Sequence, residues 1–98
     1  MAIVNVSRWK GNLTQAMPLA KEAAAIVKKH GAAYMRMGPC YSGPHAGQLY
    51  IAISFADWAT FGRAQQALAA DVNFQKLYAE ASKVVELQER SLLVTEDL

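Results

Sequence analysis

Cys40, the only cysteine of the chain, lies five residues before His45, one of its two histidines. A thiol can act as a nucleophile when an imidazole accepts its proton in an electropositive setting. Here the surrounding segment, residues 38–47, contains three glycines and two prolines, and no third group close in sequence orients the imidazole. We therefore interpret residues 42–47 as a hairpin turn and keep a reactive Cys40–His45 pair as the alternative.

The histidines are the other candidates for chemistry. His45 is the candidate for proton transfer, and the alternative candidate for a haem ligand, because it lies in an accessible, glycine-flanked loop. His30 follows Lys28 and Lys29, and we interpret it as a cation at the negative end of a helix dipole. Two histidines and one distant cysteine do not provide the three or four ligands of a zinc site. We expect no metal and no cofactor.

Three further polar residues, Tyr34, Arg36 and Tyr50, lie on two neighbouring predicted strands. Arg36 could hold a carboxylate or an enolate, and the tyrosines could donate hydrogen bonds to a developing oxyanion. The alternative is ordinary cross-strand packing around an arginine that extends to solvent. We take these three residues as the candidate substrate-binding set.

The positions of these side chains depend on the elements that carry them. Alternation of apolar and polar residues, such as Val4 and Val6 against Asn5 and Ser7, predicts strands, and apolar stripes at helical spacing predict helices. The predicted strands are residues 2–9, 32–41, 48–55 and 83–96, and the predicted helices are residues 14–30, 57–71 and 72–81.

The helix ends are readable from their residue types. We expect Thr14 or Gln15 to cap the first helix and Pro18 to lie in its first turn, where backbone N–H groups lack partners anyway. Gly31 suits the position after the helix, and Asp57 and Asp71 suit the caps of the later helices.

Large aromatic side chains are expected in the core, and charged side chains near the C-terminus at an exposed edge. The aromatic set is Trp9, Trp58, Phe61, Phe74 and Tyr78. The charged or polar set in the last strand is Glu86, Gln88 and Arg90. Met35 and Met37 are expected to fill the core rather than to line a pocket.

The element order is β-α-β-β-α(α)-β. This order predicts a single ferredoxin-like α+β domain over residues 1–98, with an antiparallel four-stranded sheet and helices on one face. A metal-carrying version is excluded because the loop after the first strand, WKGN, contains no Cys-x-x-Cys. An RNA-recognition module is disfavoured because the corresponding stretch, AGQLYIAI, has only one aromatic residue, Tyr50.

Composition limits the partners and the compartment. The net charge of +2 gives no electrostatic reason for nucleic acid or a membrane surface as a partner. A single cysteine fits a reducing compartment, and no apolar run is long enough to span a bilayer. The N-terminal sequence MAIVNVSRWK does not have the pattern of a signal peptide. We expect a cytoplasmic protein.

The chain also resembles a known superfamily over nearly its whole length. Helix 14–30 ending in KKHGA, the strand GQLYIAISF, the segment ADWATFGRAQQALAAD and the final ERSLLVTE are similar to the dimeric α/β-barrel superfamily. That group includes antibiotic-biosynthesis-type monooxygenases, EthD-like and NIPSNAP-like proteins. The resemblance implies a homodimer with its sheets face to face, and a pocket between sheet and helices or at the barrel rim. Some members are cofactor-free oxygenases, and others bind haem through a histidine.

Two functions from different classes follow as expectations. The first is binding or cofactor-free, monooxygenase-like oxidation of a small, largely apolar or aromatic molecule. The second is a non-catalytic dimeric module that binds a ligand or only assembles, and a haem-binding variant is third. The homodimer is expected through the sheet because the outer positions of strand 48–55, Tyr50, Ala52 and Ser54, carry no charge.

Overall fold

The computed structural model describes all of residues 1–98, which form four strands and three helices. In chain order these are β1 (Ala2–Gly11), α1 (Leu13–Lys29), β2 (Tyr34–Pro39), β3 (Leu49–Phe55), α2 (Trp58–Ala70), α3 (Val72–Ala81) and β4 (Val85–Thr95). Every predicted element is present, with ends that differ from the prediction by two residues or fewer. None of the helices is long and apolar enough to cross a membrane.

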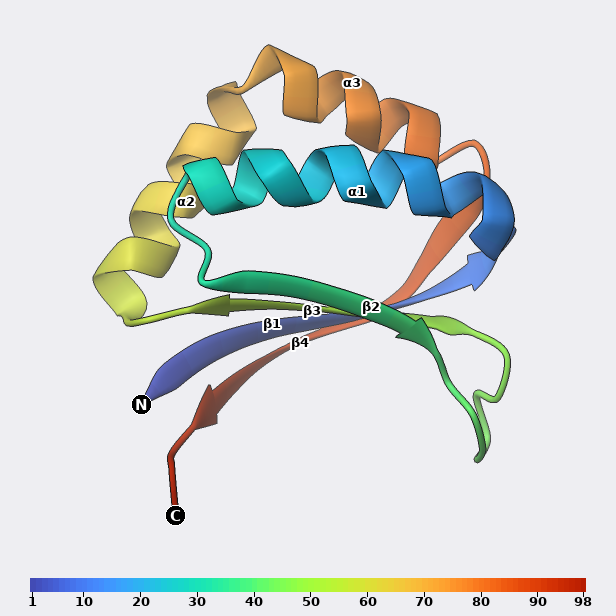
Figure 1. Cartoon of the computed structure of the whole chain (residues 1–98), viewed down its shortest axis with the longest axis horizontal. Helices are drawn as coiled ribbons and strands as arrows, with labels where there is room; N and C mark the ends of the chain where they lie inside the picture. Colours follow the sequence, from blue (N-terminus) through green and yellow to red (C-terminus); the bar gives the residue numbers. More distant parts are fainter.

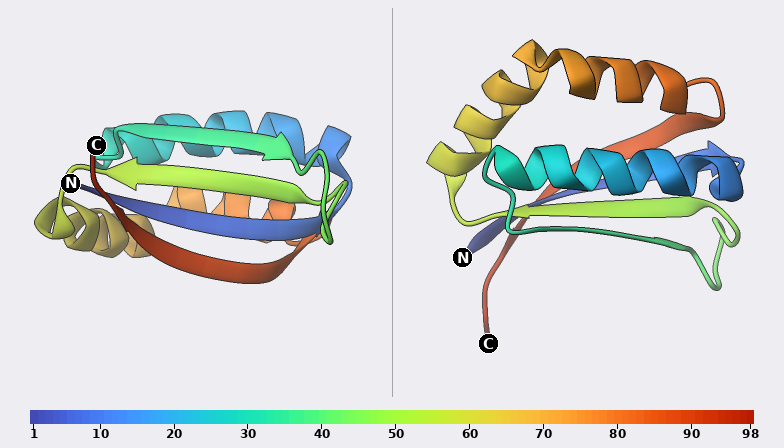
Figure 2. Two further views of the ribbon diagram at one scale, coloured as in Figure 1. Left: turned by 90° about the horizontal axis from the view of Figure 1, so that it is seen from below. Right: turned by 45° about the horizontal axis from the view of Figure 1, so that its top comes forward.

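The four strands form one antiparallel sheet in the order β2-β3-β1-β4. All three helices lie on one side of this sheet, and the other side carries no element of the chain (Figure 1). Figure 2 shows the uncovered side from below, with β1 and β3 as the central strands. This is the ferredoxin-like α+β arrangement that the element order predicts.

The first helix begins earlier than expected. Asn12, rather than Thr14 or Gln15, is the N-cap, and its side chain accepts a hydrogen bond of 3.0 Å from the backbone N–H of Gln15. Pro18 therefore lies in the second turn and not in the first. Having no N–H, it leaves the carbonyl of Thr14 without its helical donor, which is tolerable because both residues are exposed to water.

The other helix ends match the prediction. Gly31 has a φ of 113°, which places it in the left-handed region, and its N–H donates to the carbonyl of Lys28. Asp57 accepts from the N–H of Thr60 at 2.7 Å, and Asp71 accepts from the N–H of Phe74 at 3.0 Å. The backbone hydrogen bond from Thr60 is the main cause that holds the pKa of the Asp57 carboxyl below its usual 3.8.

In the middle of β1, the polar side chains lie on the face that the helices cover, and the apolar side chains lie on the uncovered face. Asn5 and Ser7 point toward the helices, whereas Val4 and Val6 point to the uncovered side of the sheet. Val4 is nonetheless buried, because side chains of the adjacent strands surround it. In the middle of β1, polar side chains therefore face the helices and apolar side chains face the uncovered side.

The hydrophobic core consists of two clusters at opposite ends of the sheet. One contains the buried residues Ile3, Val27, Ala32, Phe55, Ala64 and Leu68. The other contains Trp9, Ala16, Leu49 and Val85. Between them, Ile51 and Ile53 in the middle of β3 are only partly buried although they face the helices. The helices therefore contact the sheet at its ends and leave its middle uncovered.

Two aromatic residues expected in the core are exposed. Trp58 is 50% exposed and packs only one edge against Phe61, with ring centroids 6.0 Å apart. Trp58 is the first residue of α2, and the side chains with which α2 faces the sheet begin only at Phe61. The Trp58 ring is therefore outside the core. Tyr78 is 42% exposed for a different reason, since it lies beside a cavity described below.

One ion pair joins the end of α1 to the junction of α2 and α3. His30 Nε2 lies 2.8 Å from Asp71 Oδ2, and both side chains are mostly buried. Asp71 is both the residue that ends α2 and the N-cap of α3. The hydrogen bond from His30, followed by the backbone bond from Phe74, lowers the pKa of the Asp71 carboxyl from its usual 3.8.

We predict that His30→Ala lowers the melting temperature at pH 6 by about 4 °C, and that the difference is smaller at pH 3, below the usual carboxyl pKa of 3.8. Because the folded-state pKa of Asp71 is depressed, the carboxylate contributes its stability fully above its unfolded pKa of 3.8. That contribution is lost as the pH falls through the lower folded value. Thermal melts by circular dichroism across this range provide the measurement.

His45→Ala is the matched control, since His45 lies in the hairpin loop and forms no ion pair. It should leave the melting temperature unchanged at both pH values. A His30→Ala deficit of the same size at pH 6 and pH 3 would mean that packing, not charge, holds this junction.

Candidate functional site

A cavity of about 520 Å³ lies between the sheet and the helices. Its walls come from β1, β2, β3 and β4 on the sheet side and from α1, α2 and α3 on the other. Most of its lining is apolar, and its volume falls in the range of about 300–1,000 Å³ that is typical of small-molecule sites.

The sequence of α1 explains why protein side chains do not fill this space. The residues that α1 turns toward the middle of the sheet include Ala20 and Ala23, whose side chains are a single methyl group. Ile51 and Ile53 face them from β3 but do not reach across. Protein interiors are normally packed without gaps of this size, so the short side chains of α1 create the cavity.

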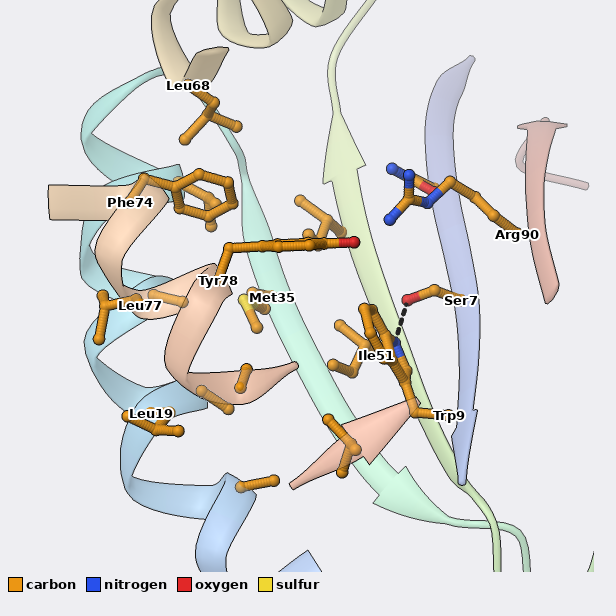
Figure 3. Close-up of a pocket in the computed structure, with 18 of the residues that line it drawn as sticks. Ser7, Trp9, Leu19, Met35, Ile51, Leu68, Phe74, Leu77, Tyr78 and Arg90 are labelled. Atoms are coloured by element: carbon orange, nitrogen blue, oxygen red, sulfur yellow. Dashed lines mark hydrogen bonds between the residues drawn. The ribbon is translucent and has the colours of Figure 1, made fainter. Parts of the chain in front are cut away.

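One side of the cavity is polar. We call this set, Asn5, Ser7, Trp9, Tyr78 and Arg90, the polar wall. The first three are alternate residues of β1, Arg90 lies opposite Ser7 on β4, and Tyr78 comes from α3. Figure 3 shows Tyr78 extending across the cavity with its hydroxyl directed toward Arg90.

Two of these groups have contrasting hydrogen-bond states. The indole Nε1–H of Trp9 donates to the hydroxyl of Ser7 at 2.8 Å, which fixes the ring at the cavity edge (Figure 3). The side-chain oxygen of Asn5, by contrast, is buried and accepts no hydrogen bond. A buried carbonyl oxygen without a donor is destabilising by about 1–3 kcal/mol.

Aromatic rings form the adjoining surface. The rings of Trp9 and Tyr78 meet edge to face with centroids 6.1 Å apart, and the ring of Phe74 lies 6.4 Å from that of Tyr78. Tyr78 and Arg90, which line the cavity, are both exposed to solvent. A flat molecule entering here would contact aromatic faces and meet the polar wall with its edge.

The structure places Tyr34, Arg36 and Tyr50 on the opposite, uncovered face of the sheet. The guanidinium of Arg36 stacks over the ring of Tyr34 at 4.0 Å, and Tyr50 lies beside Gly38. Tyr34 and Arg36 are thus brought together, but no member of this set lines the cavity. Their substrate-binding role stays a prediction.

His45 and Cys40 lie in the β2–β3 hairpin, away from the cavity. Backbone bonds from Cys40 to Gln48 and from Gly47 to Cys40, both 2.8 Å, close this turn as predicted. The Cys40 thiol donates to the carbonyl of Ser42 at 3.0 Å and forms no hydrogen bond with His45. The proton-transfer role of His45 stays a prediction.

No group of three or more histidine, cysteine, aspartate or glutamate side chains lies together in a way that could hold a metal ion. The cavity lining contains none of these residue types. The chemistry available there comes from amide, hydroxyl, indole and guanidinium groups.

Sequence reasoning missed the polar wall. Trp9 lies in the core and Arg90 is exposed on the edge strand β4, as predicted, but the sequence did not indicate that both line a cavity. Tyr78, expected in the core, is 42% exposed. The signal was present in β1, where Asn5 and Ser7 alternate with Val4 and Val6 in a strand rich in β-branched residues. The alternation alone does not say which of the two sets faces the helices, and the strand pairing is needed to decide it.

Residues 1–94 match the family model described as Domain of unknown function (DUF6854). No curated protein matches the chain at the sequence level. The matching solved structures are at low identity, so they establish the fold alone.

SnoaB from Streptomyces nogalater, a cofactor-independent oxygenase, has 14% identity and a TM-score of 0.75, with 99% of this chain and 95% of that chain covered. A NIPSNAP family protein from Agrobacterium tumefaciens has 18% identity and a TM-score of 0.72, with the same coverage. A dimeric ferredoxin-like protein from an uncultured marine organism has 12% identity and a TM-score of 0.70, with 98% of each chain covered. The resemblance to the dimeric α/β-barrel superfamily is confirmed at the level of the fold.

We predict that Asn5→Leu stabilises the ligand-free protein. The substitution replaces a buried, unpartnered amide with an apolar side chain of similar size, and should raise the melting temperature by about 5 °C. Differential scanning calorimetry measures the change. Ser7→Ala is the contrasting variant, because it removes the acceptor of the Trp9 indole and should lower the melting temperature. A destabilised Asn5→Leu protein would mean that the unpartnered oxygen of Asn5 does not lower the stability of the ligand-free protein.

Proposed function

We propose that this chain, which belongs to the family described as Domain of unknown function (DUF6854), is a homodimeric protein that binds a small, largely apolar or aromatic molecule in its cavity. The observation that carries the proposal is the cavity itself, an apolar space of about 520 Å³ with polar groups gathered on one wall. Apolar walls supply affinity, and a few fixed polar groups orient the ligand.

In its finer form, the proposal is that the bound molecule is oxidised by dioxygen without a cofactor. Support comes from the similarity of fold to SnoaB, which is described as a cofactor-independent oxygenase. Arg90 and Tyr78 are the groups of this cavity that could stabilise an oxyanion on a bound ring. The alternative is a non-catalytic binding module, and recovery of a bound aromatic molecule unchanged after incubation in air favours that alternative.

The proposed dimer forms through the uncovered face of the sheet. The centre of this face is built from small, uncharged side chains, namely Val4, Val6, Ala52 and Ser54. Leu93 of β4 points to the same face and is 48% exposed in the single chain. This apolar centre fits a second sheet packed about 10 Å away, and the charged residues of the face, Arg36 and the Arg8–Glu89 pair, would then lie around it.

The predicted site residues Tyr34, Arg36, Tyr50 and His45 do not line the cavity, so they would not contact a ligand bound there. On the uncovered face, the stacked Tyr34–Arg36 pair would lie at the rim of the dimer interface rather than in the cavity. A ligand contact from these residues would require a second binding position between the two sheets.

The cavity proposal predicts that Ala23→Leu weakens ligand binding without lowering stability. The added side chain fills part of the cavity and buries apolar surface there. With N-phenyl-1-naphthylamine as a neutral fluorescent probe, the affinity should fall by about tenfold, while the melting temperature is unchanged or higher. Fluorescence titration and thermal melts provide the two measurements.

Ala25→Leu is the matched control, because Ala25 lies on the exposed side of the same helix and does not line the cavity. It should bind the probe as the unmodified protein does. Equal weakening by both variants, or by neither, would mean that the probe binds elsewhere and that the cavity is not the site.

The dimer proposal predicts twice the chain mass of 10.7 kDa in light scattering coupled to size exclusion. Ala52→Arg should give a monomer with a lower melting temperature, because a charge in the middle of the interface is buried without a partner. Ala25→Arg, on the exposed side of α1, should leave the mass and the melt unchanged. A folded monomer in the unmodified protein at low micromolar concentration would rule out this dimer.

A further inference from the structure

We infer that the polar wall selects a hydroxylated aromatic anion, whose ionised oxygens pair with Arg90 and whose separate hydroxyl donates a hydrogen bond to Asn5. The inference rests on the proposed function, since it assigns the ligand class of the same cavity. It is carried by two observations, an acceptor without a donor and a cation without an anion, on neighbouring positions of one cavity wall.

Asn5 supplies the first half of the inference. Its Oδ1 atom is buried, and no N–H or O–H of the protein donates to it. The residue lies on a central strand and lines the cavity, and a rotation of its side-chain amide would bring this oxygen to a ligand group. An amide oxygen accepts and cannot donate, so the complementary ligand group is a hydroxyl or an N–H.

Arg90 supplies the second half. The chain contains a useful contrast in Arg8, which lies on the uncovered face, pairs with Glu89 at 3.5 Å and donates to Gln48. Arg90, an exposed residue of the edge strand β4, lines the cavity and forms neither an ion pair nor a side-chain hydrogen bond. A guanidinium has five donors and pairs with a carboxylate through two parallel bonds, so an anionic ligand complements it.

The strand register relates the two groups. Arg90 lies opposite Ser7, and Asn5 lies opposite Leu92, which makes Asn5 and Arg90 diagonal neighbours on one face of the β1–β4 pair. Diagonal neighbours are separated by about 7–8 Å, within reach of long side chains on a common ligand. One molecule with its anion and its hydroxyl at separate ring positions can therefore contact both.

The remaining surface determines the body of the ligand. Phe74 and Tyr78 of α3 and the indole of Trp9 present ring faces and edges to the cavity, while Ile51 and Ile53 form the opposite apolar floor. This combination favours a flat aromatic ring system over a flexible chain, because stacked and edge-to-face contacts add to apolar burial. A fused two-ring molecule is small enough for a cavity of about 520 Å³.

Four naphthalene compounds test the inference by isothermal titration calorimetry with the full-length protein. They are 4-hydroxy-2-naphthoate, 4-methoxy-2-naphthoate, 2-naphthoate and 1-naphthol. In the first, the meta arrangement prevents the hydroxyl from bonding to its own carboxylate. We expect it to bind at least about tenfold more tightly than each of the other three, which lack the free donor or the anion.

Two variants connect each preference to its residue. Asn5→Leu should make the hydroxy and methoxy compounds bind equally and leave 2-naphthoate within about twofold of its original affinity. Arg90→Met should remove the advantage of 4-hydroxy-2-naphthoate over 1-naphthol. Arg63→Met, an exposed arginine of α2 that does not line the cavity, is the charge control and should change neither preference.

The outcomes separate this inference from the proposed function. If the four compounds bind the unmodified protein with similar affinity, or if 4-hydroxy-2-naphthoate does not bind, the inference is overturned. If N-phenyl-1-naphthylamine binding remains sensitive to Ala23→Leu in that case, the cavity is still the ligand site. If the preferences exist but survive in Asn5→Leu and Arg90→Met, other residues determine them and the inference is again overturned.

Discussion

Antiparallel pairing of β1 between β3 and β4 fixes the direction of each of its side chains, and the rest of the structure depends on that orientation. The register puts Asn5 and Ser7 under the helices and Val4 and Val6 on the uncovered face. A shift of one residue would exchange the two sets. Because β1 is a central strand, its polarity decides what each face of the sheet can be packed against.

On the inner face, this arrangement produces a hollow core with rigid ends. Large apolar side chains hold the helices to the sheet in two separate clusters, and the alanines of α1 span the middle. The His30–Asp71 pair joins the end of α1 to the start of α3, and α3 carries Phe74 and Tyr78 of the cavity. The cavity persists because its walls are fixed at both ends, and it is lined by a residue whose side-chain oxygen is buried without a partner.

The outer face follows from the same alternation. Once the polar side chains of β1 are directed inward, its valines point outward, where they join Ala52 and Ser54 of β3, with Arg8, Arg36 and Glu89 on the same face. The two faces of the sheet therefore differ, since the cavity lies on the inner face and the valines lie on the outer one.

The sequence by itself determined the elements and their order, because these depend on local signals. The apolar stripe of residues 14–30, the glycine at position 31, the caps at Asp57 and Asp71 and the alternation of strand 48–55 all act within a few residues. The element order then left few alternatives to the ferredoxin-like fold. The hairpin around Cys40 and His45 was readable for the same reason, since its turn residues are adjacent in the chain.

Only the tertiary structure decided which side chains share a site. Asn5, Tyr78 and Arg90 come from three elements that are far apart in sequence, and no spacing rule connects them. The sequence also did not reveal that the short side chains of α1 leave a gap above the middle of the sheet. An alanine in a helix stripe is predicted to be in the core whether or not another side chain packs against it. Strand register and the distance between layers are properties of the whole fold, so they decided where the cavity lies and which of its polar groups lack partners.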